Sequence, residues 1–123
     1  MTKILYYDIE TAPNLSYVWG QYQQDVIEHK REWYIMCVSY RWEHQKRTHV
    51  CSLVDFPEAY TKDPENDFYV VKKMWELFDE ADIVIAHNGD RFDMRKANAR
   101  FVYHGLGPPA PVKSVDTLKV ARR

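Results

Sequence analysis

Residues 82–93 read DIVIAHNGDRFD, and this stretch decides the fold class. Residues 82–86 are short and apolar, which is typical of a strand buried on both faces of a sheet. A polar turn at residues 87–90 follows and leads into a predicted helix over residues 91–104. Gly105 stands where a glycine commonly ends a helix. A buried strand followed at once by a helix is the repeating unit of α/β proteins.

The flanking segments extend this pattern. Within residues 66–80, apolar side chains recur at the spacing of one helix face. Upstream, residues 3–10 (KILYYDIE) predict a strand that ends before Pro13, because proline cannot continue a ladder. Residues 34–42 and 47–54 predict two more strands, joined by a polar turn at residues 44–46.

The remaining segments carry weaker signals. We expect an irregular excursion with one helical turn over residues 14–32, and a polar loop over residues 55–65. A last short strand is expected at residues 113–115, with a helix opening at residues 116–117. The prediction is one α/β domain over residues 1–123, with a mixed sheet: antiparallel strands early and a βαβ crossover later.

Composition excludes several classes of protein. The chain has 46% hydrophobic and 28% charged residues, which suits a packed globular domain and excludes overall disorder. No apolar run approaches the roughly 18 residues of a membrane helix, and no signal-peptide stretch is present. Cys37 and Cys51 form no CxxC pair, and two free thiols suit a reducing compartment. We therefore expect a soluble, cytoplasmic protein that makes no membrane contact.

Charge is distributed unevenly along a chain whose formal net charge is −1. Residues 91–123 contain eight basic and two acidic residues, whereas the rest contains nine basic and sixteen acidic ones. A basic segment beside an acidic body could face a phosphate backbone. A solvated helix face is the commoner explanation of such a charge run.

Three acids could form a metal site. Asp8 and Glu10 are two residues apart at the end of a strand, so they share one face and stand about 6–7 Å apart. A divalent cation between them would relieve their repulsion, although exposed edge acids are more common. Asp93 lies in the first turn of a predicted helix, where the helix dipole alone favours an acid.

Two motifs and a shorter segment resemble a known family. YDIET (residues 7–11) and AHNGDRFD (residues 86–93) are similar to the first two motifs of the DEDD, or DnaQ-like, 3′–5′ exonucleases. The N-x-x-x-F-D form resembles family B polymerase proofreading domains and their stand-alone relatives in phages and bacteria, which act in DNA replication or repair. VDTL (residues 115–118) is similar to a segment that opens a later helix in this family.

The resemblance implies a ribonuclease-H-like mixed sheet with flanking helices and a two-metal nuclease site holding Mg²⁺ or Mn²⁺. By this resemblance Asp8 bridges both ions, Glu10 ligates the ion that activates water, and Asp93 holds the second ion. An all-oxygen ligand set suits these metals better than zinc. The implied activity is 3′–5′ exonuclease hydrolysis of phosphodiester bonds in DNA or RNA.

The resemblance also implies contacts to the 3′ end of a single strand. Thr11 would contact the terminal nucleotide, and Asn88 would orient substrate or brace the site. Phe92 would pack as core and so place Asp93. Arg91 and Arg95 share a helix face beside Asp93, where they could bind phosphates or be solvated surface. Arg100 lies on the same helix, and Trp19, Tyr22, Trp33 and Tyr34 could stack on bases or pack internally.

One part of the family pattern is missing. The family has a third motif, Y-x-x-x-D or H-x-x-x-x-D, which supplies a fourth acid. Nothing after Asp93 fits, because Tyr103 and His104 lack the spaced aspartate and Asp116 belongs to the VDTL segment. We therefore expect the C-terminal part of the fold to be absent, with little activity from this chain alone. Dimerisation or a second polypeptide could supply the missing motif.

Two functions follow from these residues. The first is a metal-dependent 3′–5′ exonuclease, favoured by the presence of Asp8, Glu10 and Asp93 together. The second is a non-catalytic nucleic-acid-binding or assembly module with the same fold, favoured by the missing fourth acid.

Overall fold

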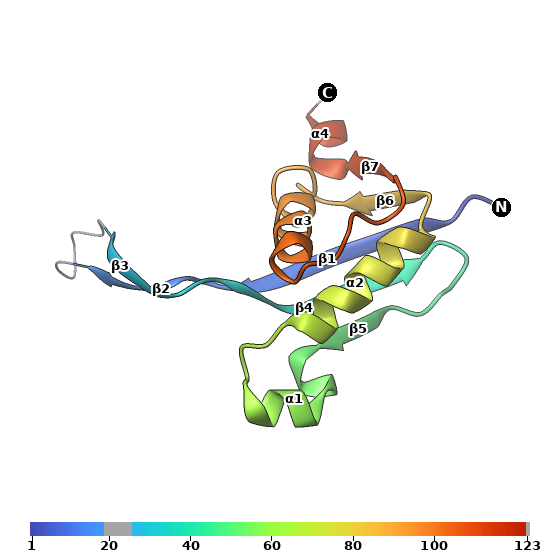
Figure 1. Ribbon diagram of the computed structural model, residues 1–123. Coiled ribbons are helices and arrows are strands. Elements are labelled where there is room, and N and C mark those ends of the chain that lie inside the picture. The colour runs from blue at the N-terminus through green and yellow to red at the C-terminus, as the bar shows by residue number, and fades with distance from the viewer. Residues whose placement is uncertain (19–25, 123) are drawn as a thin grey trace.

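The computed structural model describes residues 1–18 and 26–122 (Figure 1). Its main sheet has five strands, in the order β5 (His49–Ser52), β4 (Tyr34–Trp42), β1 (Ile4–Ala12), β6 (Ile83–Ala86) and β7 (Lys113–Asp116). Strand β1 runs antiparallel to β4 and parallel to β6, and β6 runs parallel to β7. The mixed α/β sheet predicted from the sequence is confirmed.

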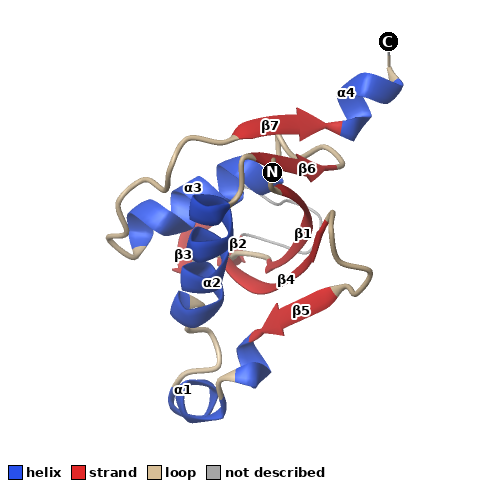
Figure 2. Cartoon of the chain, turned by 90° about the vertical axis from the view of Figure 1, so that its right-hand side faces the viewer, coloured by secondary structure: helices blue, strands red, loops and turns tan. Residues whose placement is uncertain are grey.

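Helices α2 (Phe68–Glu80) and α3 (Asp93–Tyr103) cover the same face of this sheet (Figures 1 and 2). Their buried residues include Val70, Met74, Phe78 and Phe101. These side chains meet the inward face of β1, where the Tyr7 ring packs edge-on against Phe78 at 5.1 Å between centroids. The core is therefore a layer between the two helices and one face of the sheet.

The alternation along β1 decides which side chains stay outside this core. Leu5, Tyr7 and Ile9 are buried, whereas Asp8 and Glu10 are exposed on the opposite face. Strand side chains alternate with period two, so burying the odd-numbered residues turns the even-numbered acids outward. A register shift between Glu10 and Thr11 then interrupts the pairing of β1 with β4.

The expectation of an irregular excursion over residues 14–32 is wrong. Strands β2 (Leu15–Val18) and β3 (Val26–Arg31) pair antiparallel there as a separate two-stranded sheet. The base of this pair is closed by the Trp33 N–H, which donates to Asn14 Oδ1 at 2.6 Å. Trp19 and Tyr22, considered above as stacking residues, lie outside the described residues.

Other boundaries also differ from the sequence prediction. The polar loop expected over residues 55–65 contains helix α1 (Pro57–Lys62), which Pro57 can begin because its missing N–H needs no partner in the first turn. Strand β5 is shorter than predicted, because a 3-10 turn (Leu53–Asp55) follows it. Helix α3 begins at Asp93, and α4 (Thr117–Ala121) follows β7 with Asp116 as its N-cap.

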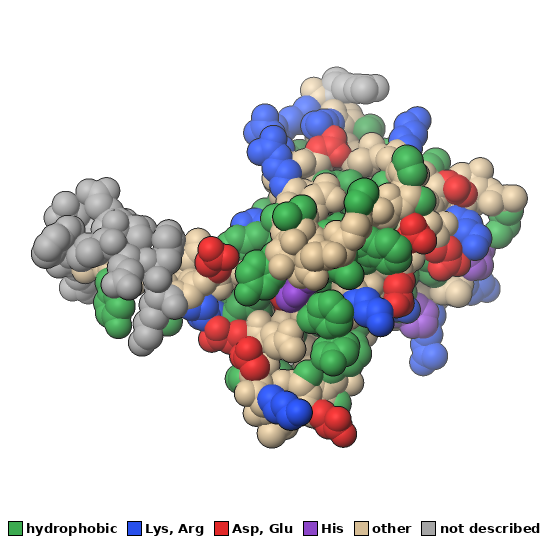
Figure 3. All heavy atoms as spheres, viewed as in Figure 1, with side chains coloured by type: hydrophobic (Ala, Val, Ile, Leu, Met, Phe, Trp, Pro, Cys, Tyr) green, Lys and Arg blue, Asp and Glu red, His purple; other side chains and the backbone are tan. Residues whose placement is uncertain are grey.

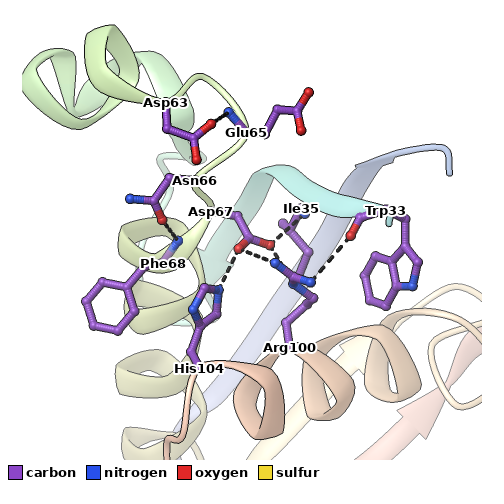
Figure 4. Close-up of polar contacts among 9 residues, drawn as sticks. All are labelled: Trp33, Ile35, Asp63, Glu65, Asn66, Asp67, Phe68, Arg100 and His104. Carbon is purple, nitrogen blue, oxygen red and sulfur yellow. Dashed lines mark hydrogen bonds and ion pairs between the residues drawn. The ribbon is translucent and has the colours of Figure 1, made fainter. Parts of the chain in front are cut away.

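A buried ionic cluster ties the two helices to the sheet (Figure 4). Asp67, fully buried before α2, accepts hydrogen bonds from Arg100 Nε at 2.8 Å and Arg100 Nη2 at 2.7 Å. Its carboxylate also contacts His104 Nε2 at 2.6 Å and accepts the Ile35 N–H of β4 at 2.9 Å. Burial opposes ionisation, yet the Arg100, Ile35 and His104 contacts hold the pKa of Asp67 below its ordinary value. One carboxylate therefore joins α2, α3 and β4.

We predict that Asp67→Asn lowers the free energy of unfolding by about 3–5 kcal/mol, because it leaves the Arg100 charge buried without its partner. The wild-type contribution is complete above the unfolded carboxyl pKa of about 3.9 and is lost as pH falls below it. Urea unfolding at pH 7 and pH 3 measures both effects. Asp63→Asn, on the exposed loop nearby, is the matched control, and an equal loss in both variants contradicts the assignment.

Candidate functional site

Asp93 reaches the strand that carries Asp8 and Glu10. Pairing between β1 and β6 ends at Tyr6 and Ile85, while β1 continues to Ala12, so the later part of β1 has a free edge on that side. The Ile9 N–H on this edge donates to Asp93 Oδ2 at 3.1 Å. The third acid of the predicted site is therefore held against the backbone between the other two.

Asp93 is only 2% exposed, which makes its charge expensive. Burial, with smaller contributions from the charges of Asp8 and Glu10, raises its pKa to about 6, although the Ile9 N–H acts in the opposite direction. Both exposed acids therefore act on the charge of Asp93. A positive charge beside the three carboxylates would favour their ionised forms.

The carboxylates do not form a closed ligand shell by themselves. Within residues 1–18 and 26–122, no three His, Cys, Asp or Glu side chains lie close enough together to hold a metal ion. The available donors are nonetheless all carboxylate oxygens, and the charges of Asp8 and Glu10 add to the effect of burial in raising the pKa of Asp93. This donor set suits a hard divalent cation such as Mg²⁺ or Mn²⁺, and it would have to close around the ion.

The turn between β6 and α3 is held in one conformation. Asn88 has a φ of 57°, in the left-handed region that few residues other than glycine and asparagine adopt. A Cβ on Gly89 would lie 2.8 Å from the Ala86 Cβ, so the turn needs a glycine there. The Met94 N–H donates to the Gly89 carbonyl at 2.7 Å and joins the turn to the first residues of α3. The path of this turn sets where Asp93 emerges.

Asp116 fixes this turn from outside, a role that the sequence analysis missed. As the N-cap of α4 it accepts the Leu118 N–H at 2.9 Å, and it also accepts the Asn88 N–H at 2.8 Å and the Asp90 N–H at 3.3 Å. These backbone bonds hold its pKa below the ordinary value in spite of desolvation. The sequence indicated a helix opening at Asp116 but contained no signal for its contacts across 28 residues.

Asp90 adds a second connection between the turn and the C-terminal segment. Its carboxylate accepts from Ser114 Oγ at 2.7 Å and pairs with Lys119 Nζ at 2.6 Å. These two contacts hold the pKa of Asp90 below its ordinary value. Asp90 and Asp93, three residues apart, therefore have carboxyl pKa values shifted in opposite directions.

The predicted nucleic-acid contacts are placed unequally. Arg95 is exposed on α3, whereas Arg91, expected on the same helix, is exposed in the turn before it. Thr11 and Asn88 are half-buried. Phe92 is 38% exposed, so the expectation that it packs as core is wrong. The physical reason is that α3 begins at Asp93, two residues later than predicted, and it is the Asp93 side chain that turns inward.

Lys96 of α3 lies between two aromatic rings beside the predicted nucleic-acid contacts. Lys96 Nζ lies 4.0 Å from the centre of the Trp33 ring and 5.8 Å from the centre of the Phe92 ring. Trp33 thus packs against α3 and remains half-buried. Arg100, which the sequence placed on the same basic helix, is buried in the cluster with Asp67 and cannot contact a phosphate.

Basic side chains gather at the top of the face shown in Figure 3, around the region that α4 and the upper end of α3 occupy in Figure 1. Acidic side chains are more numerous below, around α1 and α2. The uneven charge of the sequence therefore becomes an uneven charge of the surface, next to the turn that carries Asp93. No helix in the described part of the chain is long and apolar enough to cross a bilayer.

Comparisons with known proteins establish the fold alone. No protein-family model and no curated protein match this sequence. The structure is similar to a family B DNA polymerase from the hyperthermophilic archaeon Pyrobaculum calidifontis, with a TM-score of 0.67 and 13% sequence identity. The similarity covers 100% of this chain and 16% of the polymerase. The five-stranded mixed sheet with its helices is consistent with the ribonuclease-H-like arrangement expected from the motifs.

We predict that Asp93→Asn stabilises the protein at pH 7 by about 1–2 kcal/mol. The folded pKa of about 6 exceeds the unfolded value of about 3.9, so wild-type stability falls as pH rises from 4 to 6. Asparagine carries no charge to bury and can still accept the Ile9 N–H. Urea unfolding at pH 7 and pH 4 should show the gain at pH 7 and none at pH 4.

Asp90→Asn is the control in the same turn. Its carboxyl pKa is lowered rather than raised, so this variant should lose stability at pH 7, where the wild-type contacts with Lys119 and Ser114 are complete. If both variants change stability in the same direction, the electrostatic description of the turn is wrong.

Proposed function

We propose that this chain hydrolyses phosphodiester bonds at the 3′ end of single-stranded DNA or RNA in a reaction that depends on Mg²⁺ or Mn²⁺. The observation that carries the proposal is the contact of Asp93 with the Ile9 N–H, which places a third acid on the strand of Asp8 and Glu10. The similarity of YDIET and AHNGDRFD to exonuclease motifs supports the same function. The fold shared with a DNA polymerase is compatible with it.

The proposed roles follow from where each side chain lies. Asp8, Glu10 and Asp93 would hold the divalent ions, which supply an activated water and neutralise charge on the phosphate and the leaving oxygen. Thr11 and Asn88, half-buried beside the acids, would orient the terminal nucleotide. The Asp116 contacts keep the turn and Asp93 in place for this.

Exposed residues at the start of α3 and in the turn before it would hold the strand. Arg91 and Arg95 can neutralise phosphates, and neutralisation releases counterions from the nucleic acid. Phe92 presents an exposed ring on which a base can stack, a contact commonly worth about 1–3 kcal/mol. Its exposure favours contact with substrate over the packing role expected from the sequence.

A second candidate is a nucleic-acid-binding module without catalysis. It is favoured by the absence of a preformed group of three metal ligands among the described residues, and by the missing third motif. Both candidates bind nucleic acid through the same basic surface. Metal-dependent hydrolysis distinguishes them.

We predict slow release of mononucleotides from a 3′-labelled single strand when Mn²⁺ is present. The rate should be low because the sequence supplies only three of the family's four acids. Asp8→Asn should abolish the activity, whereas Glu58→Gln, an exposed acid on α1, should leave it unchanged. Gel electrophoresis of the products under single-turnover conditions measures the rate. Binding without any hydrolysis by the wild type would support the non-catalytic module instead.

We also predict that binding to a single strand weakens steeply with salt. Arg91→Glu combined with Arg95→Glu should reduce affinity and lower the salt slope by about 1 for each lost phosphate contact. Lys72→Glu reverses one exposed charge on α2 and is the control for the effect of each single charge reversal. Fluorescence anisotropy between 20 and 200 mM salt, about the range in which such effects are large, measures the slope. An equal effect of the α2 variant would contradict the assignment to Arg91 and Arg95.

A further inference from the structure

A hollow of about 510 Å³ opens beside Asp8, between β1, the end of β6 and the start of α4. Its lining includes Tyr6, Asp8, His87 and Thr117. The volume falls within the range of small-ligand sites, about 300–1,000 Å³. One of the three acids therefore shares a cavity with an imidazole that the sequence analysis assigned to no function.

We propose that His87 is a catalytic residue, which holds the attacking water and accepts its proton. The inference rests on the proposed function and assigns one more residue to it. Hydrolysis of a phosphodiester needs a positioned base for the water, and histidine most often performs this role in enzymes.

The ring of His87 is oriented by a neighbour. His87 Nδ1 lies 2.9 Å from Thr117 Oγ1, at the first residue of α4. When Nδ1–H donates to this hydroxyl, Nε2 keeps its lone pair and can accept a proton. Among the described residues, no hydrogen bond or ion pair engages Nε2. A base fixed by a third group is the arrangement that activates nucleophiles in many enzymes.

The backbone around His87 is fixed by the same segment. The next residue, Asn88, donates its N–H to Asp116 Oδ1 at 2.8 Å, and Asp116 directly precedes Thr117. The His87 side chain and the backbone of the turn are thus both bonded to the junction between β7 and α4. His87 is exposed to solvent and can meet a water without any rearrangement of the core.

The hydroxyl groups that line the hollow are either hydrogen-bonded or buried from solvent. The Tyr6 hydroxyl is hydrogen-bonded to Glu43, which raises the pKa of Tyr6. The Tyr7 hydroxyl is buried from solvent, and burial together with the nearby Asp93, Asp90 and Asp116 raises its pKa further from neutrality. The Thr117 hydroxyl contacts His87. Apart from Asp8, His87 is therefore the side chain of the lining that keeps an acceptor atom open to water.

The proposed step exchanges one bond at phosphorus for another. The water oxygen forms a bond to phosphorus while the bond from phosphorus to the 3′-oxygen of the preceding nucleotide breaks. The water proton passes to His87 Nε2, and the leaving 3′-oxygen takes a proton from solvent. The products are a nucleoside 5′-monophosphate and a strand shortened by one nucleotide, and His87 returns its proton to solvent.

The first test measures single-turnover hydrolysis by the whole chain with Mn²⁺. We expect His87→Gln to lower the rate constant at saturating substrate by about 10²–10⁴-fold, with the half-saturating concentration unchanged. Thr117→Val removes the same hydrogen bond but leaves the imidazole, so its rate should fall much less. His44→Gln, an exposed histidine in the turn after β4, should match the wild type. A His87→Gln rate equal to that of Thr117→Val would overturn the proposal.

The second test does not depend on activity. Mn²⁺ broadens nearby proton resonances, so titration of Mn²⁺ into the protein should broaden the His87 ring signals before those of His44, His49 and His104. Asp8→Asn should abolish this order. If another ring broadens first, the role of His87 is overturned but the proposed metal site is not. If no ring broadens, both the proposed metal site and the role of His87 are overturned. If His87→Gln still hydrolyses the strand at the wild-type rate, only the role of His87 is overturned and the proposed function stands.

Discussion

The candidate site depends on the hydrogen bond from the Ile9 N–H to the Asp93 carboxylate, which joins β1 to the start of α3. It exists because β1 extends beyond the end of β6, which leaves the backbone of β1 unpaired at that edge. The turn after β6 must then bring an acceptor to this edge, and Asp116 holds it there. The position of the Asp93 carboxylate thus depends on the length of β1, on the turn after β6 and on Asp116.

This arrangement stores unfavourable electrostatic energy at the site. Asp93 is buried near two other acids, and its pKa is raised to about 6. Asp67, which meets the far end of α3, makes four contacts with Arg100, Ile35 and His104 and has a lowered pKa. One end of the helix is stabilised by a buried ionic cluster, and the other is destabilised by an unpaired charge. Such contrasts are typical of functional sites, where ligand binding and not folding satisfies the charge.

The sequence predicted what local patterns specify. The apolar run at residues 82–86 and the one-sided helix predicted at residues 66–80 indicated the α/β fold, and the two-residue spacing of Asp8 and Glu10 placed both acids on one face of a strand. It missed β2 and β3, whose residues carry no clear alternation and pair only with each other. It also missed Asp67 and Asp116, since a buried carboxylate and its distant partners leave no periodic signal. Phe92 was misplaced because the helix boundary moved past it, and boundaries depend on tertiary contacts.

The central claim is that Asp8, Glu10 and Asp93 act together on one class of divalent cation. Calorimetric titration of Mn²⁺ into the wild type, Asp8→Asn and Asp93→Asn at pH 7.5 tests it most directly. We expect the wild type to bind saturably and both variants to bind at least about tenfold more weakly, since each removes a charged ligand. Equal Mn²⁺ affinity in all three proteins would contradict the claim, because the carboxylates would then be neighbours without a shared ligand.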